Sequence, residues 1–238
     1  MTISLITLDL DETLWPCPPV IQAAEAALYD WLCAEVPRLV ENHTVDTLRE
    51  HRLTLARSRP EIAHDLTEVR LASLRELLRE HGYGEHLAQR ASDLFREHRN
   101  RVEPFEEVLE VLGRLRERYV LVSVTNGNAQ VEHTPLREAF HLSLTAGEVG
   151  AAKPHPAMFE AALAFAGVPA EACLHVGDDP HLDVEAARQA GLGAVWMNRD
   201  GREWPSGLPP VPWRVSDLRE LEALLDPSAG RAAREGGA

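Results

Sequence analysis

Four short apolar segments, separated by stretches with helical periodicity, constrain the fold of this chain most strongly. They are residues 2–8 (TISLITL), 119–125 (YVLVSVT), 172–176 (ACLHV) and 193–197 (GAVWM). Continuous apolar runs rich in β-branched residues are typical of strands that are buried on both faces. Strands that alternate with helices predict right-handed βαβ units on a parallel sheet. We therefore expect an α/β protein with a doubly wound, Rossmann-like parallel sheet.

Amphipathic patterns flank these strands and predict the helices that cover the sheet. They cover residues 104–118, 156–167, 181–192 and 215–225. The first two begin at a proline, and the middle two end near a glycine, as helices commonly do. Residues 199–214 contain four prolines and are predicted to form a loop.

A long all-helical block separates the first predicted strand from the second. Helical periodicity runs through residues 20–101, and no convincing strand pattern interrupts it. A simple crossover needs far fewer residues, so we interpret the block as an inserted domain. The predicted organisation is an α/β core of residues 1–15 and 102–226, with a helical cap of residues 16–101. The small, polar residues 227–238 are predicted to be a disordered tail.

Composition excludes several classes of function. The formal net charge of −14 argues against a nucleic-acid backbone as partner, because such proteins carry basic stripes. The three cysteines have no CxxC spacing, which suits a reducing compartment better than a disulfide framework or a zinc site. The apolar N-terminus lacks a basic region and is too short to span a membrane. We expect a cytoplasmic protein, monomeric or dimeric, without nucleic-acid or membrane partners.

Small polar residues follow the strands at the edge where parallel sheets bind ligands. These residues are Asp9, Asp11 and Thr13 after the first strand, Thr125, Asn126 and Gly127 at the second, and Asp178 and Asp179 at the third. A fourth segment, GAAKPHPAMF, contains Lys153, the only lysine among 24 lysines and arginines. We expect these four segments to meet in one crevice.

Several acids, one hydroxyl and one cation are the groups that a divalent metal and a phosphoryl group require. Mg²⁺ prefers one or two carboxylates, which Asp9 and Asp178 can supply. An aspartate can attack phosphorus, and a fixed cation stabilises the charge that phosphoryl transfer spreads over the oxygens. A compact ammonium fits among several acids where a planar guanidinium does not, which explains why Lys153 is retained. A surface lysine and ordinary turn aspartates are the alternative interpretations.

These residues carry a resemblance to a known family. LDLDETL resembles the first motif, DxDxT, of the haloacid dehalogenase-like phosphatases. SVTNGN, AAKPHPAMF and HVGDDPHLDVEAARQAG resemble their second, third and fourth motifs, in the same order. The helical block matches the cap that these proteins insert after the first motif.

The resemblance implies a role for each matching residue. Asp9 would be the nucleophile, and Asp11 the general acid and then the base. Thr125, the backbone of Asn126 and Lys153 would hold the phosphoryl group. Asp9, the Asp11 carbonyl and Asp178 would hold Mg²⁺. Asp179 or Asp183 would orient Lys153 or a metal-bound water, and Thr13 completes the first motif.

The segments RPEIAHDLTEVR, TNGNAQ and LHVGDDPHLDV further resemble the bacterial flavin mononucleotide phosphatases. That branch also dephosphorylates a phosphoribitylamino-pyrimidine intermediate of riboflavin synthesis. The resemblance therefore implies a small phosphorylated metabolite as substrate and an aspartyl-phosphate intermediate.

Four other functions remain open at this stage. They are a sugar-phosphate phosphatase, a phosphoryl-transferring mutase, a carbon–halogen hydrolase and a non-catalytic scaffold. The carbon–halogen hydrolases of the family need no metal and lack an acid two residues after the nucleophile, so Asp11 argues against that function. In the cap, Arg70 is interpreted as part of a solvated helix face rather than a substrate contact, and Trp15 as a packing residue.

Overall fold

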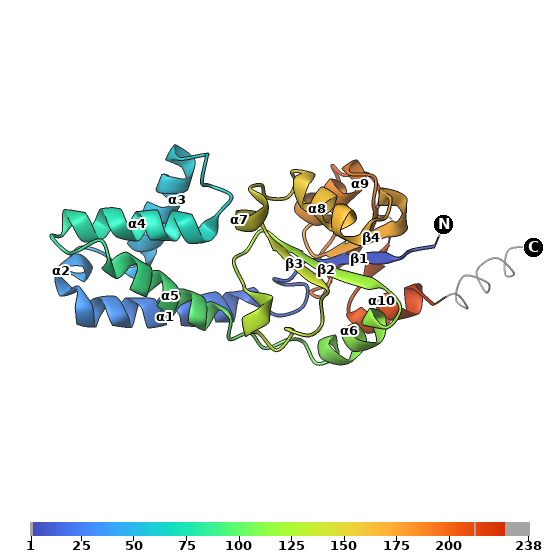
Figure 1. Ribbon diagram of the computed structural model, residues 1–238, viewed down its shortest axis with the longest axis horizontal. Coiled ribbons are helices and arrows are strands. Elements are labelled where there is room, and N and C mark those ends of the chain that lie inside the picture. The colour runs from blue at the N-terminus through green and yellow to red at the C-terminus, as the bar shows by residue number, and fades with distance from the viewer. Residues whose placement is uncertain (1, 212, 227–238) are drawn as a thin grey trace, which may run out of the picture.

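The computed structural model describes residues 2–211 and 213–226 and consists of two parts that lie side by side (Figure 1). A parallel sheet with its covering helices forms one part, and helices alone form the other. The predicted disordered tail, residues 227–238, lies outside the described residues.

Six parallel strands form the sheet, in the order β3-β2-β1-β4-β5-β6. The strands are β1 (Leu5–Leu8), β2 (Val120–Thr125), β3 (Leu142–Thr145), β4 (Cys173–Gly177), β5 (Gly193–Met197) and β6 (Arg214–Val215). The central strand β1 pairs with β2 and β4, with Leu8 opposite Ser123 and Val176. The carboxyl ends of these three strands therefore meet at one edge, as the sequence predicts.

Helices cover both faces of the sheet, which confirms the predicted doubly wound α/β architecture. On one face α6 (Val108–Arg116) and α10 (Leu218–Leu224) pack against Ile6 and Leu8. On the other, α8 (Ala157–Ala166) and α9 (Ala186–Gln189) pack with Leu5. Successive β1 side chains alternate between the two cores because strand side chains point to opposite faces.

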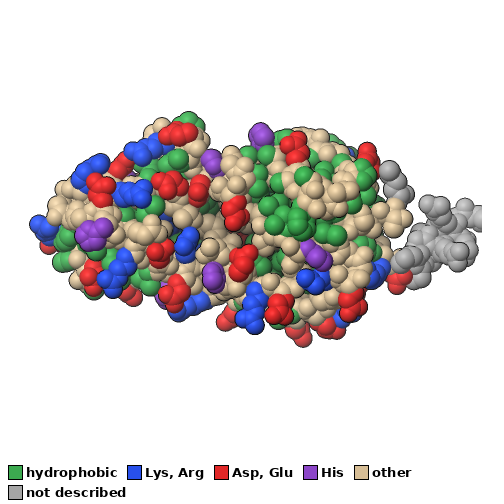
Figure 2. All heavy atoms as spheres, in the orientation of Figure 1, with side chains coloured by type: hydrophobic (Ala, Val, Ile, Leu, Met, Phe, Trp, Pro, Cys, Tyr) green, Lys and Arg blue, Asp and Glu red, His purple; other side chains and the backbone are tan. Residues whose placement is uncertain are grey.

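The helical part has a hydrophobic core of its own. Its helices are α1 (Cys17–Glu35), α2 (Pro37–Val40), α3 (Val45–Ser58), α4 (Leu66–Glu80) and α5 (Leu87–Arg99). Buried side chains such as Leu28, Leu74 and Phe95 form one apolar cluster within it. Arginines and acidic residues are interspersed over its visible surface (Figure 2).

The start of α4 contacts the α/β part through polar groups. The amide of Asn128, in the loop after β2, donates a hydrogen bond to the Thr67 hydroxyl at 3.2 Å. Asp65 accepts hydrogen bonds from the backbone N–H groups of Thr67 and Glu68 and so caps the helix. Nearby lies α7 (Ala146–Val149), which packs against α4.

Two predicted helices are present in the structure with different bounds. The helix predicted over residues 181–192 is a π-helical turn, η3 (Pro180–Glu185), followed by α9. The Asp179 carboxylate caps η3 through His181 and Leu182, which starts the turn earlier than the apolar pattern indicates. The helix expected from residue 104 begins only at Val108.

The two edge strands of the sheet also differ from the prediction. The residue expected to end the loop, Arg214, begins the short strand β6. The apolar stretch 142–146, which was not assigned to a strand, contains β3. Short 3-10 turns, η1 (Val131–His133) and η2 (Ala170–Ala172), complete the described elements.

Candidate active site

Asp9, Thr125 and Asp178 lie at the ends of three neighbouring strands, as the parallel topology requires. Asp9 follows β1, Thr125 ends β2, and Asp178 follows β4. Lys153 comes from the loop between α7 and α8. The structure thus brings together the four segments that the sequence predicts to meet.

Lys153 is the cation at the centre of this site. Its Nζ lies 2.7 Å from Oδ1 of Asp9, 2.6 Å from Oδ1 of Asp183 and 2.8 Å from the carbonyl oxygen of Val124. The residue is 4% exposed, so all three ammonium donors are used inside the protein. Burial alone would lower the pKa of Lys153, but the charges of Asp183 and Asp9 raise it above its ordinary value. The ammonium is therefore a permanent point charge.

The side chain of Asn126 holds the backbone of Lys153 in place. Its Oδ1 accepts from the Lys153 N–H at 2.7 Å, and its Nδ2 donates to the Lys153 carbonyl at 2.8 Å. The sequence predicts a role for the Asn126 backbone alone, because a side-chain contact with a residue 27 positions away leaves no local sequence signal.

Asp183 anchors the opposite side of the ammonium. Its Oδ2 accepts a hydrogen bond from the Asp179 N–H at 2.9 Å. Its Oδ1 lies 3.2 Å from Nε2 of His175, whose Nδ1 in turn lies 2.9 Å from the Thr7 hydroxyl. Burial would raise the pKa of Asp183, but the charge of Lys153 and the hydrogen bond with His175 hold it well below its ordinary value. Asp183 is therefore a carboxylate that fixes Lys153.

Asp179, unlike Asp183, does not contact Lys153. Its carboxylate caps η3 instead. Gly177, just before the two aspartates, accommodates Asp183: a Cβ on Gly177 would lie 2.2 Å from the Asp183 Cγ. Only glycine permits that approach.

Asp11 lies two residues after Asp9 and is held by two side chains. Arg99 Nη2 donates to both carboxylate oxygens at 2.7 Å, and Trp15 Nε1 donates to Oδ1 at 2.9 Å. Trp15 is fully buried, so it packs as expected and also orients Asp11. The Thr13 hydroxyl lies 3.4 Å from Oδ2 of Asp9. Arg99 is absent from the sequence prediction because it comes from the far end of the helical block.

The loop after β2 lies close to two side chains of the site. The Gly127 N–H donates to the Thr125 hydroxyl at 2.9 Å. A Cβ on Gly127 would lie 2.8 Å from Oδ2 of Asp11 and 3.1 Å from the Thr125 Oγ1, so the backbone passes very close to both side chains. Gly127 therefore allows the loop to lie against both Asp11 and Thr125.

Three carboxylates of the site fit a divalent cation. Oxygens of Asp9, Asp178 and Asp183 all lie within 4.8 Å of one another. Burial, and then the nearby Asp183, raise the pKa of Asp178 to about 6. Burial and the neighbouring acids Asp183 and Asp11 also raise the pKa of Asp9 well above its ordinary value, against the charge of Lys153. The cluster holds three carboxylates and one cation, Lys153. Its carboxylate oxygens are the ligands that Mg²⁺ or a similar hard cation prefers.

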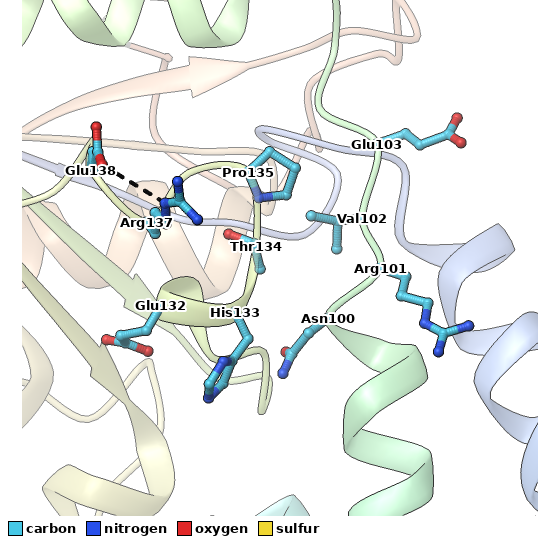
Figure 3. A pocket seen from close by; sticks show the side chains of 10 residues that line it. All are labelled: Asn100, Arg101, Val102, Glu103, Glu132, His133, Thr134, Pro135, Arg137 and Glu138. Atoms are coloured by element: carbon cyan, nitrogen blue, oxygen red, sulfur yellow. Dashed lines mark ion pairs between the residues drawn. The ribbon is translucent and has the colours of Figure 1, made fainter.

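Two large hollows in the described part of the chain lie outside this cluster. One of about 810 Å³ lies between residues 100–103 and 132–138, with Arg137 and Glu138 paired at its edge (Figure 3). Another, of about 790 Å³, lies between the helical part and the loops of the site, and Glu12 and Asn128 are among its lining residues. The second adjoins the site through Glu12, which follows Asp11, and through Asn128 in the loop after β2. A smaller hollow, of about 240 Å³, lies between the start of α4 and Gly127.

Comparison with known proteins places the chain in a family. The model of the haloacid dehalogenase-like hydrolases matches residues 3–191. The chain belongs to the haloacid dehalogenase-like hydrolases. The predicted family and the prediction of an enzyme of its phosphatase kind are confirmed.

The relatives include phosphatases and a protein described as a dehalogenase. The chain is 32% identical over 231 residues to the 5-amino-6-(5-phospho-D-ribitylamino)uracil phosphatase YigB of Escherichia coli, covering 94% of this chain and 96% of that protein. It is 38% identical over 154 residues to the phosphoserine phosphatase of Thermus thermophilus, covering 62% of this chain and 61% of that enzyme. A crystal structure of a 2-haloacid dehalogenase from Pseudomonas syringae pv. Tomato superposes with a TM-score of 0.87, at 38% identity and 94% and 98% coverage.

None of the helices in residues 2–211 and 213–226 combines the length and the apolar character needed to cross a membrane.

Proposed function

We propose that the protein is a Mg²⁺-dependent phosphomonoester hydrolase that acts through an aspartyl-phosphate on a small phosphorylated metabolite. The observation that carries the proposal is the contact of one ammonium, Lys153, with Asp9 and Asp183 beside Asp178. A riboflavin-pathway phosphate or flavin mononucleotide is the first substrate to test, since a relative along nearly the whole chain is named for such a phosphate.

In the first step Oδ of Asp9 attacks phosphorus, and the bond between phosphorus and the ester oxygen breaks. Asp11, two residues on, donates its proton to the departing alkoxide. Lys153, Thr125 and the backbone N–H groups after β2 hold the oxygens on which charge develops. In the second step Asp11 takes a proton from water, which attacks phosphorus and releases Asp9 and inorganic phosphate.

The residues that would hold Mg²⁺ are Asp9, Asp178 and the backbone carbonyl of Asp11, with Asp183 close enough to contribute. When bound, the cation neutralises phosphate charge so that a carboxylate is not repelled by its anionic target. Arg202 pairs with Asp178 at 3.0 Å and keeps that carboxylate oriented from outside the cluster.

We further propose that residues 16–101 act as a cap over the strand ends, with residues 1–15 and 102–226 as the catalytic core. The contact of Asn128 with Thr67 supports this role, since it joins the first turn of α4 to the loop that follows β2. The leaving group of the substrate would lie between cap and core.

A carbon–halogen hydrolase is the second candidate, favoured by the description of the similar Pseudomonas syringae structure. In that reaction Asp9 would attack carbon and release a halide, which needs no proton. An alkoxide leaving group needs a proton, and Asp11, held close to Asp9 by Arg99 and Trp15, is the acid that can supply it. The geometry therefore favours phosphate chemistry.

The test is release of phosphate from a panel of phosphomonoesters, with flavin mononucleotide included, at saturating Mg²⁺. Activity is expected to disappear with EDTA and with Asp9→Asn, and kcat/KM identifies the preferred substrate. Undiminished phosphate release in the presence of EDTA, or by the Asp9→Asn variant, contradicts the proposal. Halide release from a 2-haloacid, with no turnover of any phosphate, supports the second candidate instead.

A further inference from the structure

The cavity of about 790 Å³ between the helical part and the site has mostly apolar walls. Its apolar lining includes Ile21, Leu53, Ala56, Leu66 and Val69. Leu53 and Leu66 are each 47% exposed, so large apolar surface faces this space. Glu12 and Asn128 also line it, and Glu12 directly follows Asp11. The cavity therefore lies where the leaving group of a bound phosphomonoester would extend.

A charged cluster stands in the wall of this apolar cavity. Arg52 Nη2 lies 2.5 Å and Arg70 Nη2 lies 2.8 Å from the same oxygen, Oε1 of Glu25. Arg70 Nη1 lies 3.3 Å from Oε2 of that residue. Two guanidinium groups thus share one carboxylate, and the side chains of all three residues are at most 14% exposed. The interpretation of Arg70 as a solvated residue was wrong.

The cluster holds more positive charge than its own carboxylate balances. The guanidinium carbon of Arg70 lies 3.3 Å from the centroid of the Phe95 ring, which fixes its plane. Its Nε is buried and has no hydrogen-bond partner within the described part of the chain. Burial, and then the charge of Arg70, lower the pKa of Arg52 to about 10. Glu12 and Asp46 also line the cavity, together with Arg49, but the ion pairs of Arg52 and Arg70 within the described residues go to Glu25 alone. Buried charge without a partner is costly, so a further acceptor would be favourable here.

A purely structural pair in the same helices looks different. Arg59, which follows the last residue of α3, pairs with Glu76 of α4, and the Arg59 side chain is 43% exposed. Glu76 Oε2 also lies 3.9 Å from Nε2 of His51. Arg59 does not line the cavity. This contact joins α3 to α4 with one guanidinium on the carboxylate, and Arg59 therefore gives a control for Arg52.

We propose that the Glu25–Arg52–Arg70 cluster selects the substrate by binding a planar oxygen acceptor at the far end of an apolar leaving group. The inference rests on the proposed phosphatase function. The acceptor is a carboxylate or the carbonyl edge of a ring, because both present oxygens in the plane that a guanidinium recognises. The substrate class is accordingly a phosphomonoester whose alcohol has a ring or similar apolar body and such an acceptor.

The experiment compares kcat/KM for four substrates: phenyl phosphate, meta- and para-carboxyphenyl phosphate, and flavin mononucleotide. The wild-type enzyme is expected to prefer at least one acceptor-bearing substrate over phenyl phosphate by about tenfold or more. Arg52→Met is expected to bring that ratio close to one, mainly through KM, and Arg52→Lys to restore part of it. Arg59→Met is expected to leave the ratio unchanged. Preference for a carboxyphenyl ester identifies a carboxylate as the acceptor that the cluster binds. Preference for the flavin identifies the carbonyl edge of a ring as that acceptor.

Two outcomes overturn the inference while leaving the proposed function intact. One is turnover of phenyl phosphate at least as good as that of every acceptor-bearing substrate. The other is an equal loss with all substrates in Arg52→Met, which a merely structural role in the helical part would produce, with a lowered Tm. Absence of phosphate release from all four substrates would instead count against both the inference and the phosphatase function.

Discussion

Arg99, the last residue of α5, lies with its Nη2 2.7 Å from both carboxylate oxygens of Asp11. The Arg99 side chain is 1% exposed, so this ion pair is shielded from solvent on the arginine side. The contact connects the end of the helical part with the acid that the proposed mechanism requires. It makes Arg99 a positioning residue for Asp11.

The loss of activity on replacement of Arg99 should therefore depend on the leaving group of the substrate. We expect Arg99→Met to lower kcat/KM for an alkyl phosphate by about tenfold to a hundredfold, within the range that general acid catalysis contributes. The loss with 4-nitrophenyl phosphate should be much smaller, because nitrophenolate departs without a proton. Arg101→Met, an exposed neighbour paired with Glu97, is the control. Equal losses with both substrates would show that Arg99 acts only on stability.

Lys153 should matter for folding as well as for activity. In Lys153→Met the buried carboxylates of Asp9 and Asp183 lose their cation, which should cost about 3–5 kcal/mol in the free energy of unfolding. Urea unfolding in EDTA measures the effect, and Mg²⁺ should reduce it. Lys153→Arg should not restore activity, because a guanidinium does not fit where Nζ contacts three oxygens.

A double-mutant cycle gives the control for Lys153. Asp9→Asn removes one of the two carboxylates, so Asp9→Asn/Lys153→Met should be less destabilised than the sum of the single changes. Additive effects, or a stable Lys153→Met protein in EDTA, would contradict the buried ion-pair account.

The carboxylate cluster predicts stabilisation by metal. Mg²⁺ that binds only the folded state should raise the Tm of the wild-type protein, by roughly 2–4 °C for each kcal/mol of binding stabilisation. Asp178→Asn should remove most of that shift. Asp30→Asn, an exposed residue of α1, should retain it. If Asp178→Asn responds to Mg²⁺ as fully as the wild type does, the cation binds elsewhere.

Glu107 makes stability depend on pH away from the site. Its Oε1 accepts from Arg199 Nη2 at 2.8 Å and from the Leu218 N–H at 3.3 Å. Burial would raise the pKa of Glu107, but these bonds hold it below the ordinary value of 4.5. The stabilisation is thus complete above about pH 4.5 and is lost as the pH falls through the lower folded-state pKa.

Glu107→Gln tests this pH dependence. The variant should be less stable at neutral pH by about 1–3 kcal/mol, since Arg199 loses its charged partner. Between about pH 5 and about pH 3, the range in which an ordinary carboxyl group titrates, its free energy of unfolding should fall less steeply than that of the wild type. Parallel pH profiles for the two proteins would refute a role of the Glu107 carboxylate.

The strands that the sequence predicted best are those with continuous apolar runs. β1, β2, β4 and β5 fall within or next to the predicted segments because they are buried on both faces. The two-residue strand β6 has no such pattern, since Arg214 is exposed and pairs only with the edge of β5. The start of η3 depends on the Asp179 cap, which a search for apolar periodicity does not detect.

The site shows the same division between local motifs and distant contacts. Asp9, Asp11 and Asp178 stand in short motifs at strand ends, and the parallel topology explains why they meet. Lys153 stands in a short motif in the loop between α7 and α8. Arg99 and the side-chain contacts of Asn126 could not be predicted, because their partners are 88 and 27 residues away. The shared carboxylate of Arg52 and Arg70 likewise depends on how three helices pack.

The most direct test of the central claim is mass spectrometry of the enzyme after acid quenching during turnover of a good substrate with Mg²⁺. We predict one phosphoryl group on the peptide that contains Asp9, absent in Asp9→Asn and after EDTA treatment. An enzyme that releases phosphate at full rate while Asp9 is never phosphorylated, or that does so with asparagine at position 9, would contradict the account.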